Sequence, residues 1–144
     1  MTSFSKQVGA FRDKARKRSL AIFRESAQRL VHQANRSRDD GGRLPVDTGF
    51  LRASMVASKS GVPSGPGRGR ARKAGETGLL YSSPLGQPVE LVILSAQLGE
   101  TIWAGWSANY SVFMEERYGF FRTGAQNWQN IVNEVTVEAK RRIP

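Results

Sequence analysis

One periodic stripe of apolar residues constrains this chain more than any other feature. From Phe4 to about Arg36 the apolar side chains recur at spacings of three, four and seven, which places them on one face of a helix. The members of the stripe are Phe4, Val8, Phe11, Ala15, Ile22, Phe23, Ala27, Leu30 and Ala34. The sequence therefore predicts a long N-terminal amphipathic helix. Its basic residues, Arg12, Arg16 and Lys17 among them, lie largely off the stripe.

An arginine-rich amphipathic N-terminus is also typical of organelle transit peptides, which are poor in acidic residues. Here the pattern continues to about residue 36 and includes Asp13 and Glu25. We interpret the segment as part of the folded protein.

Length and composition limit the kind of protein further. The chain has 144 residues, enough for a single domain over residues 1–144 with one modest core. It has no run near the roughly 18 apolar residues that cross a bilayer, so we expect a soluble protein with no membrane partner. It contains no cysteine and a single histidine, His32, which excludes disulfides, thiolate sites and paired-histidine zinc motifs. We expect no cofactor and no bound metal.

The net charge of +10 is divided unevenly along the chain. Residues 1–74 carry 17 Lys or Arg against five acidic residues, whereas residues 75–138 carry two against seven. The positive excess indicates a polyanionic partner, most simply nucleic acid. The two-ended distribution would also let copies of the chain meet, positive face to negative face.

The middle of the chain predicts short elements around a small sheet. Residues 36–44 are polar with paired glycines, typical of a turn. Asp47 is a good helix N-cap, so we expect a short helix from about Thr48 to Ala57. The β-rich segments Val89–Ser95 and Thr101–Ser107 predict a hairpin.

The last third of the chain predicts two more helices. Asn109 is a candidate cap for one that closes at Gly119. Apolar residues at helical spacing from Ala125 to Ala139 predict a last amphipathic helix with a basic end, which suits the helix dipole. With a candidate strand at Leu79–Ser82, the expected fold is α+β. It has a long N-terminal helix, a short helix, a small antiparallel sheet with a long basic loop, and a C-terminal helix.

Residues 59–78 are rich in Gly, Pro and Arg, and we expect a flexible loop within the domain. Four cations lie close together in it: Arg68, Arg70, Arg72 and Lys73. They suit sequence-independent phosphate binding, and they equally suit a linker that charge keeps solvated. Arg12, Arg16 and Lys17 on the first helix are the second candidate nucleic-acid surface.

Asp47-Thr48-Gly49 is the triplet of aspartic proteases, in which paired carboxylates activate water. In those enzymes it follows an apolar strand, whereas here Arg43-Leu44-Pro45 precedes it. Helix capping is the better interpretation, and the adjacent pair Glu115-Glu116 fits a solvated surface. We expect no enzymatic activity.

Eight aromatic residues crowd into residues 103–128. They could stack on single-stranded bases, but Glu115 and Glu116 would repel phosphate. We therefore expect core and subunit-interface packing. The candidate interface residues are Tyr110, Glu115, Glu116, Phe120 and Phe121.

Residues 44–54 resemble the PVDTG-x-LR-x-S signature of the tail-completion or neck proteins of long-tailed bacteriophages. The matching residues are Pro45, Asp47, Thr48, Gly49, Leu51, Arg52 and Ser54. In that family a tyrosine segment, a glutamate near a glycine, and an aromatic residue that opens a C-terminal helix follow. Tyr110, Glu115, Gly119 and Phe120-Phe121 occupy those places, so the resemblance spans about residues 4–142.

The resemblance implies a structural virion protein at the phage head–tail junction, assembled in the host cytoplasm. Such a subunit forms a homo-oligomeric ring and is needed to join or complete the tail. The implied partners are copies of itself, head-connector or head-closure proteins, tail terminator or tail tube proteins, and genomic DNA in the lumen. The alternative is a free basic nucleic-acid-binding protein with sequence-independent phosphate contacts.

Overall fold

The computed structural model describes residues 3–47, 49–63, 68–69, 81–82 and 88–144. Its elements are α1 (Phe4–Ala34), the 3-10 turn η1 (Arg38–Asp40), α2 (Phe50–Ala53), β1 (Met55–Ser58), β2 (Arg68–Gly69), β3 (Tyr81–Ser82), α3 (Val89–Ser95), β4 (Trp103–Trp106), α4 (Ser111–Tyr118), α5 (Phe120–Gln126) and α6 (Trp128–Arg142). The predicted α+β class is confirmed, as are the long first helix and the C-terminal helix.

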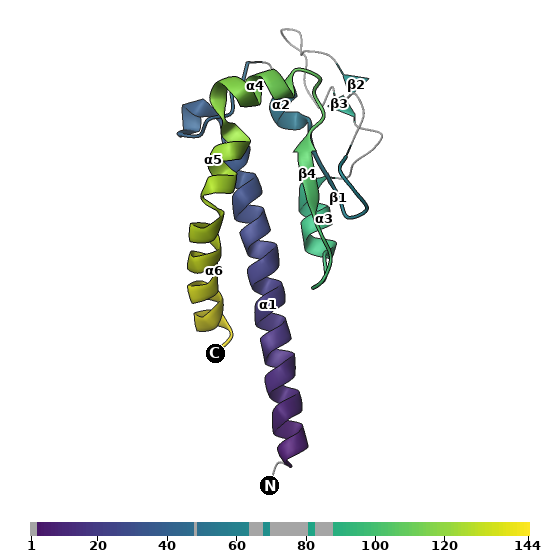
Figure 1. Cartoon of the computed structure of the whole chain (residues 1–144), viewed down its shortest axis with the longest axis vertical. Helices are drawn as coiled ribbons and strands as arrows, with labels where there is room; N and C mark the ends of the chain where they lie inside the picture. Colours follow the sequence, from purple (N-terminus) through teal and green to yellow (C-terminus); the bar gives the residue numbers. More distant parts are fainter. Residues whose placement is uncertain (1–2, 48, 64–67, 70–80, 83–87) are drawn as a thin grey trace.

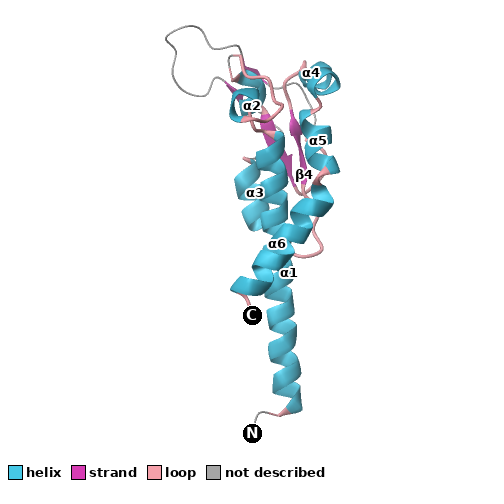
Figure 2. Ribbon diagram, turned by 90° about the vertical axis from the view of Figure 1, so that its left-hand side faces the viewer, coloured by secondary structure: helices cyan, strands magenta, loops and turns pink. Residues whose placement is uncertain are grey.

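Helix α1 is a long helix that runs along the long axis of the molecule (Figure 1). Its 31 residues span about 46 Å at the usual rise of an α-helix. Helices α5 and α6 pack along one side of its C-terminal half, and α3 packs against another side. The N-terminal half of α1 extends beyond the C-terminal end of α6 (Figure 2). The other described residues therefore cover only part of the helix.

The sheet joins distant parts of the chain. Strand β1 pairs antiparallel with β4, in a register that sets Met55 opposite Trp106 and Ser58 opposite Trp103. Strands β2 and β3 form a second two-stranded sheet, which includes the Tyr81–Ser82 part of the predicted strand. The predicted small antiparallel sheet is present, but its strands are not those of the predicted hairpin.

The hairpin prediction is wrong for its first half, because Val89–Ser95 forms α3. As a helix it turns Val89, Val92 and Ile93 inward together, where they pack with Ala57 and with partly buried residues of α1. Burial of three apolar side chains on one face outweighs the β propensity of the sequence. The second half does supply β4, which pairs with β1 instead of with its neighbour in sequence.

The predicted helix from Thr48 to Ala57 is also wrong in extent. Helix α2 is a single turn, and the residues after it form β1. Its N-cap position is Gly49, which has a left-handed conformation (φ 82°) and leaves no side-chain cap hydrogen bond. Asp47 therefore does not cap α2 as predicted. The Asn109 prediction fails in the same way, since Tyr110 holds the N-cap position of α4 without a side-chain cap.

Two clusters of buried apolar residues form the core of the described part of the chain. One contains Leu44, Leu51, Ala108 and Phe120, and the other contains Ala57, Val89, Val92 and Ile93. A third contact line runs between α1 and α6, where the side chains of Ile131, Val135 and Ala139 are buried. Gly124 of α5 lets the helices approach closely, since a Cβ there would lie 3.2 Å from Leu30 Cδ1.

Polar contacts fix the C-terminal half of α1 in this packing. Arg24 Nε donates to the carbonyl oxygen of Ala96 at 2.9 Å. The guanidinium of Arg29 binds Glu25 at 3.0 Å and also binds Glu138 of α6. The hydrogen bond from Arg29 lowers the pKa of Glu138 below its ordinary value, and the Glu138 carboxylate raises the pKa of Arg29. Arg24 and Arg29 are therefore bound to groups of their own chain.

Candidate assembly and nucleic-acid interface

The signature segment, residues 44–54, connects several elements of the fold. Leu51 is buried in the first apolar cluster. Ser54 is fully buried, and its Oγ donates to the Leu51 carbonyl at 2.7 Å. The Ser54 carbonyl oxygen in turn accepts from the backbone N–H and the hydroxyl of Ser107, at 3.0 and 2.9 Å. The signature thus links α2 to the end of β4.

The second segment that resembles the family, Tyr110–Phe121, packs against the first. Gly119 ends α4 in a left-handed conformation (φ 62°), as predicted for the helix end. The Glu115 carboxylate then accepts hydrogen bonds from the backbone N–H groups of Phe121 and Arg122, each at 2.8 Å. Glu115 therefore satisfies the free amides at the start of α5. Sequence reasoning missed this role, although a glutamate four residues before a helix-ending glycine was visible.

Phe120 belongs to the core of its own chain. Its side chain is 2% exposed and packs edge-on against Trp106 at a centroid distance of 4.7 Å. The prediction that Phe120 contacts a neighbouring subunit is wrong, because its surface is already covered. Phe121 is 43% exposed and Glu116 is exposed, so the interface prediction for these two stands open.

Tyr110 lies at a small cavity between α2 and α4. The cavity has a volume of about 250 Å³, and its lining consists of Pro45, Asp47, Gly49, Phe50, Leu51, Tyr110 and Met114. Tyr110 stacks on Phe50 at a centroid distance of 6.0 Å. Burial raises the pKa of the Tyr110 hydroxyl, and the Asp47 carboxylate adds to the rise, while a backbone hydrogen bond with Leu51 opposes it. Asp47 is thus the acidic member of an otherwise apolar pocket.

A larger open groove of about 670 Å³ lies between α1, α2 and α3. The signature residue Arg52 lines it together with Arg36, above a floor that includes Val31 and Ile93. Neither guanidinium has an ion-pair partner within the described part of the chain. His32 lies on the same rim, and no group of three or more metal-ligating side chains occurs among the described residues.

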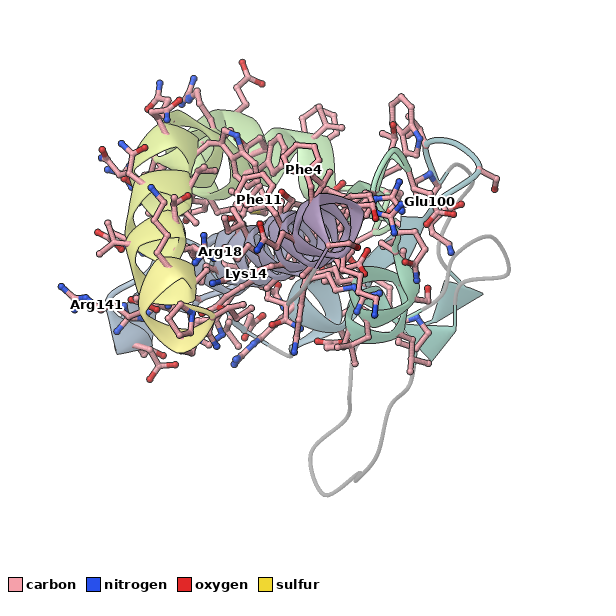
Figure 3. All side chains as sticks on the ribbon, turned by 90° about the horizontal axis from the view of Figure 1, so that it is seen from below. Phe4, Phe11, Lys14, Arg18, Glu100 and Arg141 are labelled. Carbon is pink, nitrogen blue, oxygen red and sulfur yellow. The ribbon has the colours of Figure 1, made fainter. Side chains whose placement is uncertain are left out.

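The N-terminal half of α1 differs from the C-terminal half, against which α3, α5 and α6 pack. We call Phe4–Lys17 the arm. Phe4 is 81% exposed and Phe11 is 72% exposed, so the predicted stripe is present here but uncovered. Figure 3, which looks at the molecule from below, shows Phe4 and Phe11 on the same side of α1. The apolar face of the arm is open to a partner.

The predicted nucleic-acid residues of α1 lie on this arm. Arg12, Arg16 and Lys17 are all exposed. Arg12 forms an exposed ion pair with Asp13 at 3.1 Å. Arg16 and Lys17 have no hydrogen-bond or ion-pair partner among the described residues, which leaves their charge free for a phosphate or a carboxylate.

The loop candidates can be placed only in part. The backbone of Arg68 belongs to β2, whereas Arg70, Arg72 and Lys73 lie outside the described residues, as do Thr48 and most of the predicted 59–78 loop. The structure therefore brings together the signature and the Tyr110–Phe120 segment, and it places the arm, which carries Arg12, Arg16 and Lys17, at the other end of the molecule (Figure 1).

Comparisons with protein-family models, with curated proteins and with solved structures give no match to this chain. None of its described helices combines the length and the apolar character that a membrane span needs.

Proposed function

We propose that this protein is a structural subunit of a bacteriophage neck, acting at the head–tail junction to join or complete the tail. The observation that carries the proposal is the convergence of the two segments that resemble the family. Leu51 of the first and Phe120 of the second belong to one buried cluster, with Tyr110 packed against it. Residues nearly 70 positions apart in the sequence thus form one unit.

The roles of the polar residues in that unit favour a structural protein over an enzyme. The Ser54 hydroxyl donates to the Leu51 carbonyl, the Ser107 hydroxyl donates to the Ser54 carbonyl, and Glu115 caps a helix. Asp47 lies in a pocket whose other described members carry no second carboxylate, whereas aspartic-protease chemistry needs a pair. Polar groups that hold the backbone supply stability and shape.

The surface supports a place beside DNA in an oligomeric ring. The arm carries five cations and one acid, and cations around a passage would attract the phosphates of DNA without reading its sequence. The expected partners are copies of this chain, a head-connector or head-closure protein, a tail terminator or tail tube protein, and the genome in the lumen. The expected location is the virion.

The test is deletion of the gene from the genome that encodes it, with electron microscopy of the particles released on lysis. We expect DNA-filled heads and unattached tails, with joined particles restored when the wild-type chain is supplied separately. Val137→Gln, at an exposed site on α6, should restore joining, whereas Leu51→Asp should not, because it places a charge in the shared core. Joined, infectious particles from the deletion would overturn the proposal.

A second candidate is a free nucleic-acid-binding protein, and the unpaired cations Arg16 and Lys17 favour it. A salt titration of DNA affinity separates the two functions, since each phosphate contact adds about 0.9 to the slope of log affinity against log salt. Tight, sequence-independent binding by the monomer, lost in Arg16→Gln/Lys17→Gln, together with normal particles after gene deletion, would favour this candidate.

A further inference from the structure

The apolar face of the arm is built for contact with another protein surface. Phe4, Val8 and Phe11 are spaced by four and three residues, so they share one side of α1, and they are 81%, 49% and 72% exposed. Exposed aromatic residues in a contiguous row are unusual on a monomer and mark interaction sites. Phosphates of a duplex would use the cations of the arm and leave these rings in water.

The opposite end of the molecule carries a second uncovered apolar surface. On α4, Val112 and Phe113 are 71% and 69% exposed, and Glu116 lies beside them at helical spacing. We call these three residues the α4 surface. Met114 of the same helix and its N-cap residue Tyr110 line the 250 Å³ pocket, with exposed Asp47 also in the lining.

The two surfaces are complementary in charge as well as in polarity. The arm has a net charge of +4 over residues 4–17. The α4 surface and the pocket contribute the carboxylates Glu116 and Asp47, and the cation of α4, Arg117, lies over the Tyr118 ring at 5.6 Å, so the net charge of these three groups is negative. Apolar contact supplies affinity, and opposite charge supplies orientation and a faster encounter.

The arm cannot reach the α4 surface of its own chain. It is a continuous part of α1 and points away from α4, which lies at the other end of the molecule (Figure 1, Figure 2). A contact between these two surfaces therefore requires two copies. Because different patches meet, the contact is heterologous and repeats from copy to copy, which closes a ring when the rotation between copies allows it.

We propose that the arm of one copy docks on the α4 surface of the next, with its phenylalanine side chains against Val112 and Phe113 and at the adjoining pocket. This inference deepens the proposed neck function, because it names the contact between ring subunits. It concerns the purified chain alone, so it is tested without particles or DNA.

The experiment compares three double variants of the full chain by analytical ultracentrifugation and native mass spectrometry. The arm variant is Phe4→Gln/Phe11→Gln, and the receiving variant is Val112→Gln/Phe113→Gln. The control is Leu91→Gln/Val137→Gln, which removes two exposed apolar side chains from α3 and α6. All six residues are exposed helix positions, and glutamine is a good helix former. Unchanged melting and circular dichroism verify that each variant folds.

We expect the wild type and the control to form oligomers. The arm variant and the receiving variant should each dissociate, with a dissociation constant at least about tenfold higher, as expected when an aromatic anchor is lost. Higher salt should weaken the wild-type oligomer.

Mixing the arm variant with the receiving variant tests whether the arm and the α4 surface bind each other. Each variant keeps one intact surface, so an equimolar mixture should form a one-to-one heterodimer that grows no further. Self-association by the receiving variant alone would overturn the proposal in favour of an arm-to-arm contact, and a monomeric mixture would also overturn it. Wild-type-like oligomers of the arm variant would show that the arm is not used. A positive result with normal particles after gene deletion would leave the contact standing and remove the neck function.

Discussion

The two halves of α1 have the same sequence character and opposite surroundings. Both halves continue one apolar stripe with cations beside it. From Arg18 onward the helix lies against α3, α5 and α6, and its cations bind Ala96, Glu138 and the C-terminal segment. In the arm, Phe4 and Phe11 are exposed. A periodic apolar stripe thus indicates that a helix packs against another surface. It does not indicate whether that surface belongs to the same chain or to another molecule.

The largest expected difference between the halves concerns a buried charge. Val135 of α6 is fully buried, and Val135→Asp should lower the free energy of unfolding by about 3–5 kcal/mol, because the carboxylate has no partner there. Val8→Asp in the arm should change the free energy of unfolding by less than about 0.5 kcal/mol at protein concentrations low enough for the chain to be monomeric. Urea unfolding measures both. Equal losses would mean that the arm is packed in the monomer.

A glycine in each half sharpens the comparison. Gly124 faces the covered half of α1, where a new Cβ would meet Leu30, whereas nothing lies within 4 Å of such an atom at Gly9. Gly124→Val should destabilise by about 1–3 kcal/mol through overpacking. Gly9→Val should be neutral or slightly stabilising, since glycine is a poor helix residue. Thermal melting of the two variants is the measurement, and a loss at Gly9 that matches the loss at Gly124 would contradict the difference.

The adjacent residues Glu115 and Glu116 test which carboxylate stabilises its own chain and which one contacts another copy. Glu115→Ala removes both hydrogen bonds to the start of α5 and should cost about 0.5–2 kcal/mol, as for other helix caps. Glu116→Ala should leave stability nearly unchanged while weakening self-association. Denaturant unfolding combined with sedimentation separates the two effects. A Glu115→Ala chain that is stable but monomeric would contradict the capping role and support the predicted role of Glu115 at the subunit interface.

The smallest effect is a pH dependence. The hydrogen bond from Arg29 lowers the pKa of Glu138 in the folded state, so this contact stabilises the fold above the ordinary glutamate pKa and is lost as the pH falls through the lowered value. Arg29→Gln should therefore make the acid side of the stability profile shallower, whereas Arg16→Gln in the arm should leave its shape unchanged. Melting temperatures across pH 2–7 provide the check. Identical profiles for the wild type and Arg29→Gln would remove the contact from the stability of the fold.

Sequence by itself determined the elements whose signals are local and long. The stripe from Phe4 predicts α1, the apolar spacing from Ala125 to Ala139 predicts α6 closely, and Gly119 marks a helix end. Each of these rests on several turns of repeating pattern or on a backbone conformation that glycine favours.

Tertiary structure decided the short elements and the site. Val89–Ser95 has the β-rich composition of a strand, and burial against α1 selects the helix. Strand β1 exists because β4, nearly 50 residues later, pairs with it. The same holds for Glu115, whose capping role needs the turn at Gly119, and for Phe120, which is covered by Trp106. The conformation of these short segments and the roles of these residues depend on contacts between residues far apart in the sequence. A short segment alone contains too few side chains to specify them.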